Sequence, residues 1–142
     1  MVSSRAQALS IAELGALALS DAAAALDSAD SAAAFLGALD HNRRIWTRLG
    51  EVAATLSWTV PDSELVAYAL RTTDPSVAAA GRDDHIQSLI DINTRLSAQL
   101  AGGDADLARL RERARALWEA EGRDGADGLG GWLVATIEGW AD

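Results

Sequence analysis

The sequence contains no cysteine, only two prolines and few aromatic residues, which make up 5% of its 142 residues. Without cysteine the chain has no disulfide and no thiol chemistry. Because strands favour β-branched and aromatic residues, their scarcity argues against an all-β domain. The early apolar stretch over residues 6–26 is interrupted by Glu13 and Asp21, so it is a poor signal peptide and too broken to span a bilayer. We therefore expect a cytoplasmic protein.

Basic charge is also scarce, and lysine is absent. The twelve basic residues are all Arg, against 21 acidic residues, and the net charge is −9. The excess is spread evenly, with four Arg and eight acids in residues 1–70 and eight Arg and thirteen acids in residues 71–142. Such a surface repels phosphate backbones and anionic lipids, which disfavours direct nucleic-acid binding and membrane-surface binding.

Residues that could carry catalysis or hold a metal are few. With only His41 and His85 and no cysteine, a zinc site would need carboxylates as its further ligands, so we expect no metal. Each histidine lies beside acidic residues in an expected helix, where ion pairing explains it without catalysis. The glycine pairs at 102–103 and 130–131 neither follow a strand nor precede a Lys-Ser/Thr pair, so they are not phosphate loops. We predict a protein that is not an enzyme and needs no cofactor.

Helix-forming residues are abundant. The chain has 31 Ala and 19 Leu, together about a third of the sequence, and both are strong helix formers. A chain of this length buries a single core. We predict an all-α fold, a small helical bundle of five to six helices.

Capping and breaking residues place these helices. Ser10 followed by Glu13 fits a capping box, and Pro61 and the pair Gly102-Gly103 mark two of the breaks. The expected helices cover about residues 10–26, 31–58, 62–71, 84–100, 105–121 and 132–140. We interpret the glycine-rich residues 122–131 as a flexible linker. The chain then divides into a helical domain, residues 1–102, and a C-terminal helical extension, residues 103–142, packed on the same domain.

Two of the expected helices carry an asparagine within an apolar stripe. The stripes are Phe35, Leu39, Asn42, Trp46, Leu49, Ala53 and Leu56, and Ile86, Leu89, Asn93, Leu96 and Leu100, with Ile90 and Ile92 beside the second. Their steps of three and four are typical of a core-facing helix. Because a buried, unpaired amide costs about 1–3 kcal/mol, each asparagine needs a partner: the other asparagine, a broken backbone segment or a bound chain.

These side chains leave two interpretations open. The asparagines either set the register inside a helical core, or they face a groove and bond to the backbone of a partner. Arg43, Arg44 and Arg48 either form a solvated flank that pairs with nearby acids, or grip a carboxylate or backbone carbonyl of a partner. Trp46 and Trp58 are expected in the core.

The last expected helix is strongly apolar. One face carries Leu129, Trp132, Leu133, Thr136, Ile137 and Trp140. Glu138 is the only charged residue from 129 to 140, so an uncovered helix would leave a large apolar patch in water. The helix therefore either folds back over a groove of the domain or docks on another chain. If it folds back, it would occupy, in the resting protein, the groove of the domain that binds a partner.

Three segments resemble, in order and approximate spacing, the bacterial flagellar biosynthesis regulator FlaF family. Residues 39–47, LDHNRRIWT, resemble the ALxxNRRLW segment of that family. Residues 60–65, VPDSEL, resemble its LPxEL helix start, and residues 88–95, SLIDINTR, resemble its LIEINR segment. The resemblance covers about residues 19–102 and indicates a diverged member in which residues 103–142 are a C-terminal extension.

The resemblance implies a non-enzymatic role. Proteins of this family are needed for flagellin production and filament assembly, a flagellin-binding role is attributed to them, and they act beside a second regulator, of the FlbT type, that controls flagellin messenger RNA. A small helical protein with an apolar groove would hold an amphipathic terminal helix of flagellin, as a chaperone does. The residues then expected to bind the partner are Asn42, Arg43, Arg44, Trp46, Leu49, Ile90, Asn93 and Arg95.

Two other functions remain as alternatives. The chain would instead be a structural helical subunit of an oligomeric assembly if the stripes and the last helix form a self-interface. Translational control by direct RNA contact is a third function, which the acidic charge disfavours.

Overall fold

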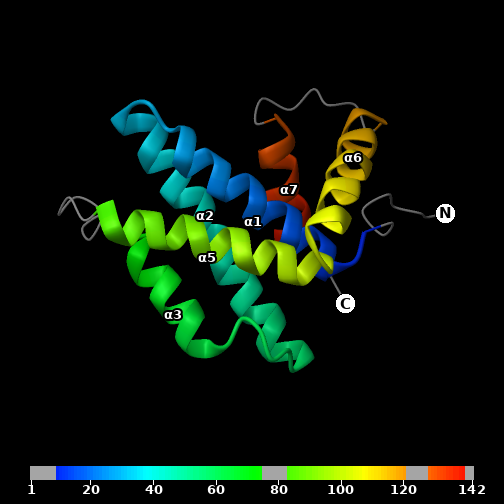
Figure 1. The fold of residues 1–142 in the computed structure, drawn as a ribbon, viewed down its shortest axis with the longest axis horizontal. Helices are drawn as coiled ribbons and strands as arrows, with labels where there is room; N and C mark the ends of the chain where they lie inside the picture. The colour runs from blue at the N-terminus through cyan, green and yellow to red at the C-terminus, as the bar shows by residue number, and fades with distance from the viewer. Residues whose placement is uncertain (1–8, 75–82, 121–127, 140–142) are drawn as a thin grey trace.

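The computed structural model describes residues 9–74, 83–120 and 128–139, which form six α-helices and no strand (Figure 1). The helices are α1 (Ile11–Ser28), α2 (Ala32–Leu56), α3 (Ser63–Thr72), α5 (Asp83–Ala101), α6 (Asp104–Ala120) and α7 (Gly128–Glu138). The predicted all-α fold, a small helical bundle, is confirmed. None of the helices in these described ranges is both long and apolar enough to cross a membrane.

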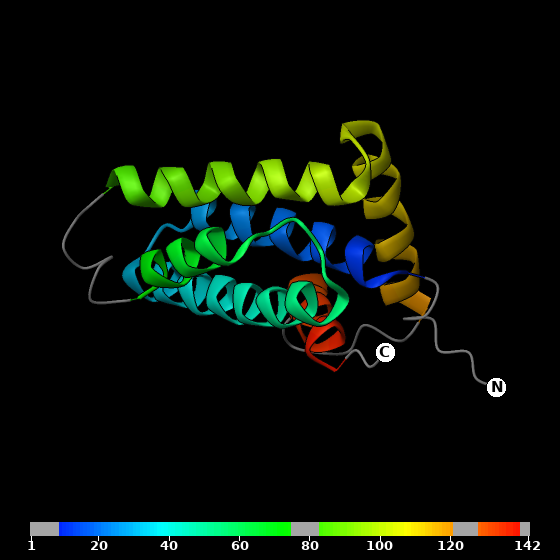
Figure 2. The same ribbon diagram turned by 90° about the horizontal axis from the view of Figure 1, so that it is seen from below.

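Helix α1 is the centre of the bundle. Six consecutive residues, 14–19, are buried, as expected of a helix that other helices enclose on every side. Its largest interfaces are with α5 and α2, and α1 lies between these two helices in Figure 2. Small residues permit this close packing: an ideal Cβ on Gly15 would lie 2.9 Å from a methyl carbon of Leu49 on α2 and 3.4 Å from one of Leu100 on α5.

The helices begin and end where local side-chain chemistry places them. The capping box of α1 is confirmed: the Ser10 hydroxyl accepts from the Glu13 amide at 3.1 Å, and the Glu13 carboxylate accepts from the Ser10 amide at 2.9 Å. After α5, Gly102 and Gly103 adopt φ values of 95° and 131°. Both of their amides donate to the Ala98 carbonyl, at 3.0 and 2.9 Å, which ends the helix as predicted.

Two expectations need correction. The predicted linker does not reach residue 131, because α7 already begins at Gly128, and its first turn packs on the side chain of Asp21. The rest of that linker, residues 122–127, and Trp140 lie outside the described residues. Leu56 does not continue the buried stripe of α2: it is 41% exposed, because it is the last residue of the helix and extends past the packed region.

A single apolar cluster runs through the described helices. It includes the buried face of α1 and α2 together with Leu110 and Ala114 of α6 and Leu133, Val134 and Ile137 of α7. The helices on either side of residue 102 therefore share one core.

Candidate functional site

A chain of hydrogen bonds between buried side chains joins α2 to α5. The Trp46 indole N–H donates to the Asn93 side-chain oxygen at 2.9 Å, and the Asn93 amide nitrogen donates to the Asn42 oxygen at 2.5 Å. The Asn42 amide nitrogen then donates to the carbonyls of Ala38, at 2.8 Å, and Ala22 on α1, at 3.3 Å. The asparagines thus pair with each other, one of the three partners that the sequence left open.

This chain lies in the interior. Asn42, Asn93, Trp46 and Leu49 each have an exposed fraction of 0%, so in this arrangement they do not line an open groove. Their polar atoms are satisfied by one another and by backbone carbonyls, as buried amides require. These four predicted partner-binding residues therefore hold α1, α2 and α5 in register and are not accessible to a partner.

The arginines of α2 face outward and reach other helices. Arg43 donates to the Leu70 carbonyl at 3.1 Å, which satisfies a carbonyl in the last turn of α3. Arg44 forms a two-bond ion pair with the Glu138 carboxylate, at 3.1 and 2.6 Å. The Arg48 Nε donates to the Ile137 carbonyl at 3.0 Å. The carboxylate and carbonyl contacts foreseen for a partner are thus made within this chain.

The other two predicted residues lie on α5. Ile90 is half-buried and packs against the core, whereas Arg95 is exposed. Within the described ranges no ion pair is assigned to Arg95. Neither side chain reaches the surface that α7 covers on α1 and α2.

Helix α7, which is strongly apolar, covers a surface of α1 and α2 that we call the α7 seat. Leu133, Val134 and Ile137 of α7 are buried, with exposed fractions of 2% or less. Leu17 of α1 lines a cleft with Leu133, and Ala38 of α2 lines a second cleft with Val134. The last helix therefore folds back on the domain, the first of the two placements that the sequence left open.

Charged groups lie at both ends of the α7 seat. At the first turn of α7, an ideal Cβ on Gly130 would lie 3.2 Å from the Asp21 side-chain carboxyl carbon. At the other end, Arg44 and Arg48 hold Glu138 and the Ile137 carbonyl. A carboxylate near a helix N-terminus and cations near its C-terminus both complement the helix dipole. The α7 seat thus has a direction as well as an apolar floor.

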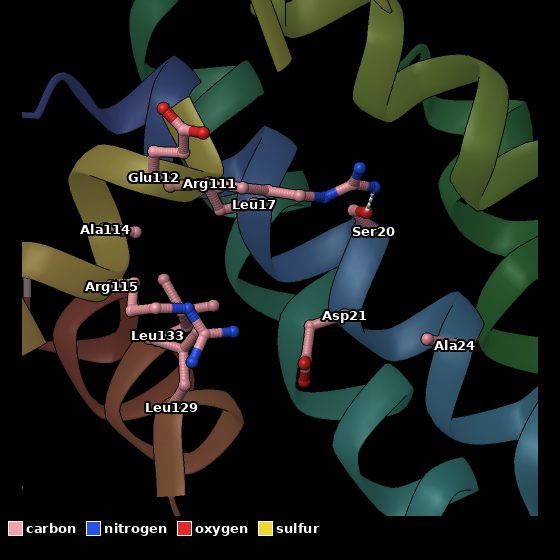
Figure 3. A pocket seen from close by; sticks show the side chains of 10 residues that line it. All are labelled: Leu17, Ser20, Asp21, Ala24, Arg111, Glu112, Ala114, Arg115, Leu129 and Leu133. Carbon is pink, nitrogen blue, oxygen red and sulfur yellow. Dashed lines mark hydrogen bonds between the residues drawn. The ribbon is translucent and has the colours of Figure 1, made fainter. Parts of the chain in front are cut away.

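A cleft of about 330 Å³ borders the α7 seat, between α1, α6 and α7. Figure 3 shows Arg111 reaching from α6 to the Ser20 hydroxyl on α1, and Arg115 extending from α6 toward α1. The floor is apolar, with Leu17, Leu129 and Leu133. The cleft shows that α6 and α7 do not close completely over α1.

A second, more apolar cleft of about 610 Å³ lies between α2 and α3. Among its lining residues are Trp58, Val66 and Leu70, which are half-buried, and Gly50 and Ala54. Trp58, which we expected in the core, thus lies at the edge of it.

Some residues at the interface between α7 and the α7 seat were not predicted as site residues. Asp21 entered the sequence argument only as an interruption of an apolar run, and Glu138 only as a lone charge. Val134 lies beside the predicted stripe of the last helix. The signal that could have identified the two acids is their charge: each is an isolated acid next to small or apolar residues.

His41 lies beside the α7 seat, with its Nε2 3.4 Å from the carboxylate of Asp21 on α1. In the described ranges no group of three or more His, Cys, Asp or Glu residues is placed to hold a metal ion. Comparison of the chain with protein-family models, curated proteins and solved structures finds no match.

Proposed function

We propose that this protein is a non-enzymatic, cytoplasmic regulator of flagellum biosynthesis that binds flagellin in a chaperone-like way. In this role it would hold an amphipathic terminal helix of flagellin and support the synthesis and secretion of that protein. Two lines of support have different origins. The three FlaF-like segments suggest the partner, and the α7 seat suggests how a helix is held.

One observation carries the proposal: a surface of α1 and α2 already holds an apolar helix of this chain. It contacts the apolar face of that helix through a floor that includes Leu17 and Ala38. It contacts the end of the helix through Arg44 and Arg48. This is the helix-in-groove mode of recognition, in which anchors at i, i+3 and i+4 positions enter an apolar groove.

The charge balance supports a protein partner over a nucleic acid. The net charge is −9, and the arginines of α2 are engaged with carbonyls and carboxylates. Phosphate backbones bind where uncompensated cations gather. We therefore place any effect on flagellin messenger RNA with a separate regulator of the FlbT type.

Binding of purified monomeric flagellin, measured by isothermal titration calorimetry, tests the proposal. We expect a 1:1 complex with the full chain and loss of binding when the terminal helices of flagellin are removed. Arg48→Ala should weaken the complex about tenfold, because it removes the donor to the last carbonyls of the bound helix. Arg109→Ala is the matched control, because Arg109 is exposed on α6 and pairs with Asp106. Absence of binding to flagellin would contradict the proposal.

The second candidate, a structural subunit of an oligomer, draws on the α2–α3 cleft. That cleft and the 41% exposed Leu56 give an apolar surface of the kind that self-association covers. Light scattering after size-exclusion chromatography distinguishes the candidates. A stable oligomer of the native chain at micromolar concentration, dissociated by Leu56→Glu, would favour the structural subunit. A monomeric native chain would contradict that candidate.

A further inference from the structure

Helix α7 depends on its contacts with the bundle for its helical structure. It has eleven residues, three of them glycine at 128, 130 and 131, and a helix this short and rich in glycine has little stability of its own. Three of its side chains are buried. Its ion pair with Arg44 joins side chains that are 50% and 37% exposed, so solvent screens that contact.

The α7 seat selects the direction of the helix that it holds. In the observed direction Asp21 meets the N-terminal turn and Arg44 and Arg48 meet the C-terminal turn. A helix in the reverse direction would bring its carbonyl ends to Asp21 and its free amides to the arginines. Both encounters oppose the helix dipole, so the reversed helix binds less well.

The α7 seat also selects the side chains of its helix. The first turn favours a small residue beside Asp21, because the Cβ of an alanine at 130 would force the Asp21 carboxyl group to shift. Apolar residues are then needed at the positions of Leu133, Val134 and Ile137. An acid follows at the position of Glu138, where Arg44 receives it. From position 130 to position 138, with Trp132 packed against the core, the pattern is small, any, apolar, apolar, apolar, two of any kind, apolar, acid.

We infer that α7 is an internal stand-in for a partner helix, meaning that it occupies the site of that helix. The partner helix displaces α7 and binds the α7 seat in the same direction. The partner is an amphipathic helix with this pattern and with better helix formers than the glycines of α7. This inference rests on the proposed function for the identity of the partner, but the displacement itself does not depend on flagellin. A partner that binds only chains in which α7 has left its seat raises the fraction of such chains by mass action.

A redox-controlled lock on α7 tests the inference in the full chain. The native sequence has no cysteine, and Asp21 and Gly130 are close enough for a disulfide, since an ideal Cβ at 130 lies 3.2 Å from the Asp21 carboxyl carbon. The variant Asp21→Cys, Gly130→Cys should hold α7 in place when oxidised and release it when reduced. The probe is a fluorescent peptide of residues 128–139, with binding measured by fluorescence anisotropy.

We expect the reduced chain to bind this peptide at least tenfold more tightly than the oxidised chain. Equal binding in the two states, or no binding to the reduced chain at peptide concentrations up to 1 mM, where a short tether gives effective concentrations of about millimolar, would overturn the inference. Because one chain is compared with itself, a general loss of folding is detected by circular dichroism in both states and is not mistaken for release.

A single charge reversal gives an independent measurement. Glu138→Arg places two like charges together at Arg44, which weakens the hold on α7. The peptide, which keeps its glutamate, should then bind about threefold more tightly than to the native chain, because the contact is partly exposed and screened. Asp91→Arg is the control, because Asp91 is exposed on α5 and the charge change is the same. Equal binding to native chain and Glu138→Arg would contradict the inference.

Flagellin in the same assay separates the two proposals. If oxidation of the disulfide controls binding of the α7 peptide and flagellin does not bind, the inference about α7 is supported and the proposed function is contradicted. If flagellin binds equally to oxidised and reduced chains, the proposed function is supported and the inference that a partner displaces α7 is contradicted.

Discussion

At the residue scale, two buried asparagines offset the cost of burying their amide groups by bonding to each other. Asn42 and Asn93 are fully buried, and their 2.5 Å hydrogen bond links two residues that are 51 positions apart in the sequence. Trp46 depends on the same chain, because its N–H donates to Asn93. Any other register of α2 on α5 would leave these three side chains without partners, so the chain favours a single arrangement.

Replacement of Asn93 tests this chain of bonds. Asn93→Leu leaves the Trp46 N–H and the Asn42 oxygen without a partner in the core, so we expect the free energy of unfolding to fall by about 2–4 kcal/mol. Urea denaturation followed by circular dichroism measures it. Thr94→Ala is the control: Thr94 is exposed on the same helix, and its loss should cost less than about 0.5 kcal/mol.

A double variant separates pairing from burial. Asn42→Leu with Asn93→Leu removes both amides, so the combined loss should be at least about 1 kcal/mol smaller than the sum of the single losses. Strictly additive losses would show that the two amides do not depend on each other.

The sequence predicted the asparagines but not the partners of the arginines. Asn42 and Asn93 were identifiable because each replaces an apolar residue at a core-facing helix position. The contact between Arg44 and Glu138 spans 94 residues, and nothing local in either helix indicates it. Long charged side chains take whichever partner the packing of helices brings near.

At the element scale, glycines within helices report how closely two helices approach. Gly15 on α1 faces Leu49 and Leu100, whereas an ideal Cβ on Gly37 of α2 would meet no atom within 4 Å. Both residues cost helix stability relative to alanine. They differ in what the added methyl group would touch, so one substitution has opposite expected effects at the two sites.

We expect Gly37→Ala to stabilise the protein and Gly15→Ala to destabilise it. The first gains about 0.5–1 kcal/mol of helix propensity without a new contact. The second gains the same but forces the methyl groups of Leu49 away in a filled core, which costs about 1–3 kcal/mol, for a net loss of roughly 1–2 kcal/mol. Thermal unfolding measures both, and a destabilising Gly37→Ala would contradict the assignment of an open site.

Helix ends were predictable where capping residues mark them, as at Ser10, Glu13 and Gly102. The start of α7 was not. Gly128, Gly130 and Gly131 are typical of a linker by composition, yet they form the first turn of α7, in which Gly130 packs beside Asp21. Tertiary contacts override weak local preference in such segments, and a single sequence does not display those contacts.

At the scale of the whole molecule, the sequence predicted one small bundle but not where its last helix lies. The apolar face of α7 is equally suited to α1 and α2 of its own chain and to another molecule. The choice depends on the α7 seat as a whole: the floor that includes Leu17 and Ala38, Asp21 at one end, and Arg44 and Arg48 at the other. That arrangement exists only after α1 and α2 have packed.

The bundle should therefore open in two steps of different free energy. The centre, α1, is buried along most of its length and opens only when the whole molecule unfolds. Helix α7 is held by three buried side chains, by the partly buried Leu129 and Trp132, and by contacts at its two ends. Native-state hydrogen exchange measures this directly. We expect amides of residues 132–138 to exchange through an opening at least about 2 kcal/mol easier than that of residues 15–26. In the oxidised Asp21→Cys, Gly130→Cys chain this difference should shrink, because the disulfide holds the first turn of α7. Equal protection of α1 and α7 in the native chain would mean that the two helices unfold together, and a partner could then reach the α7 seat only by unfolding the domain.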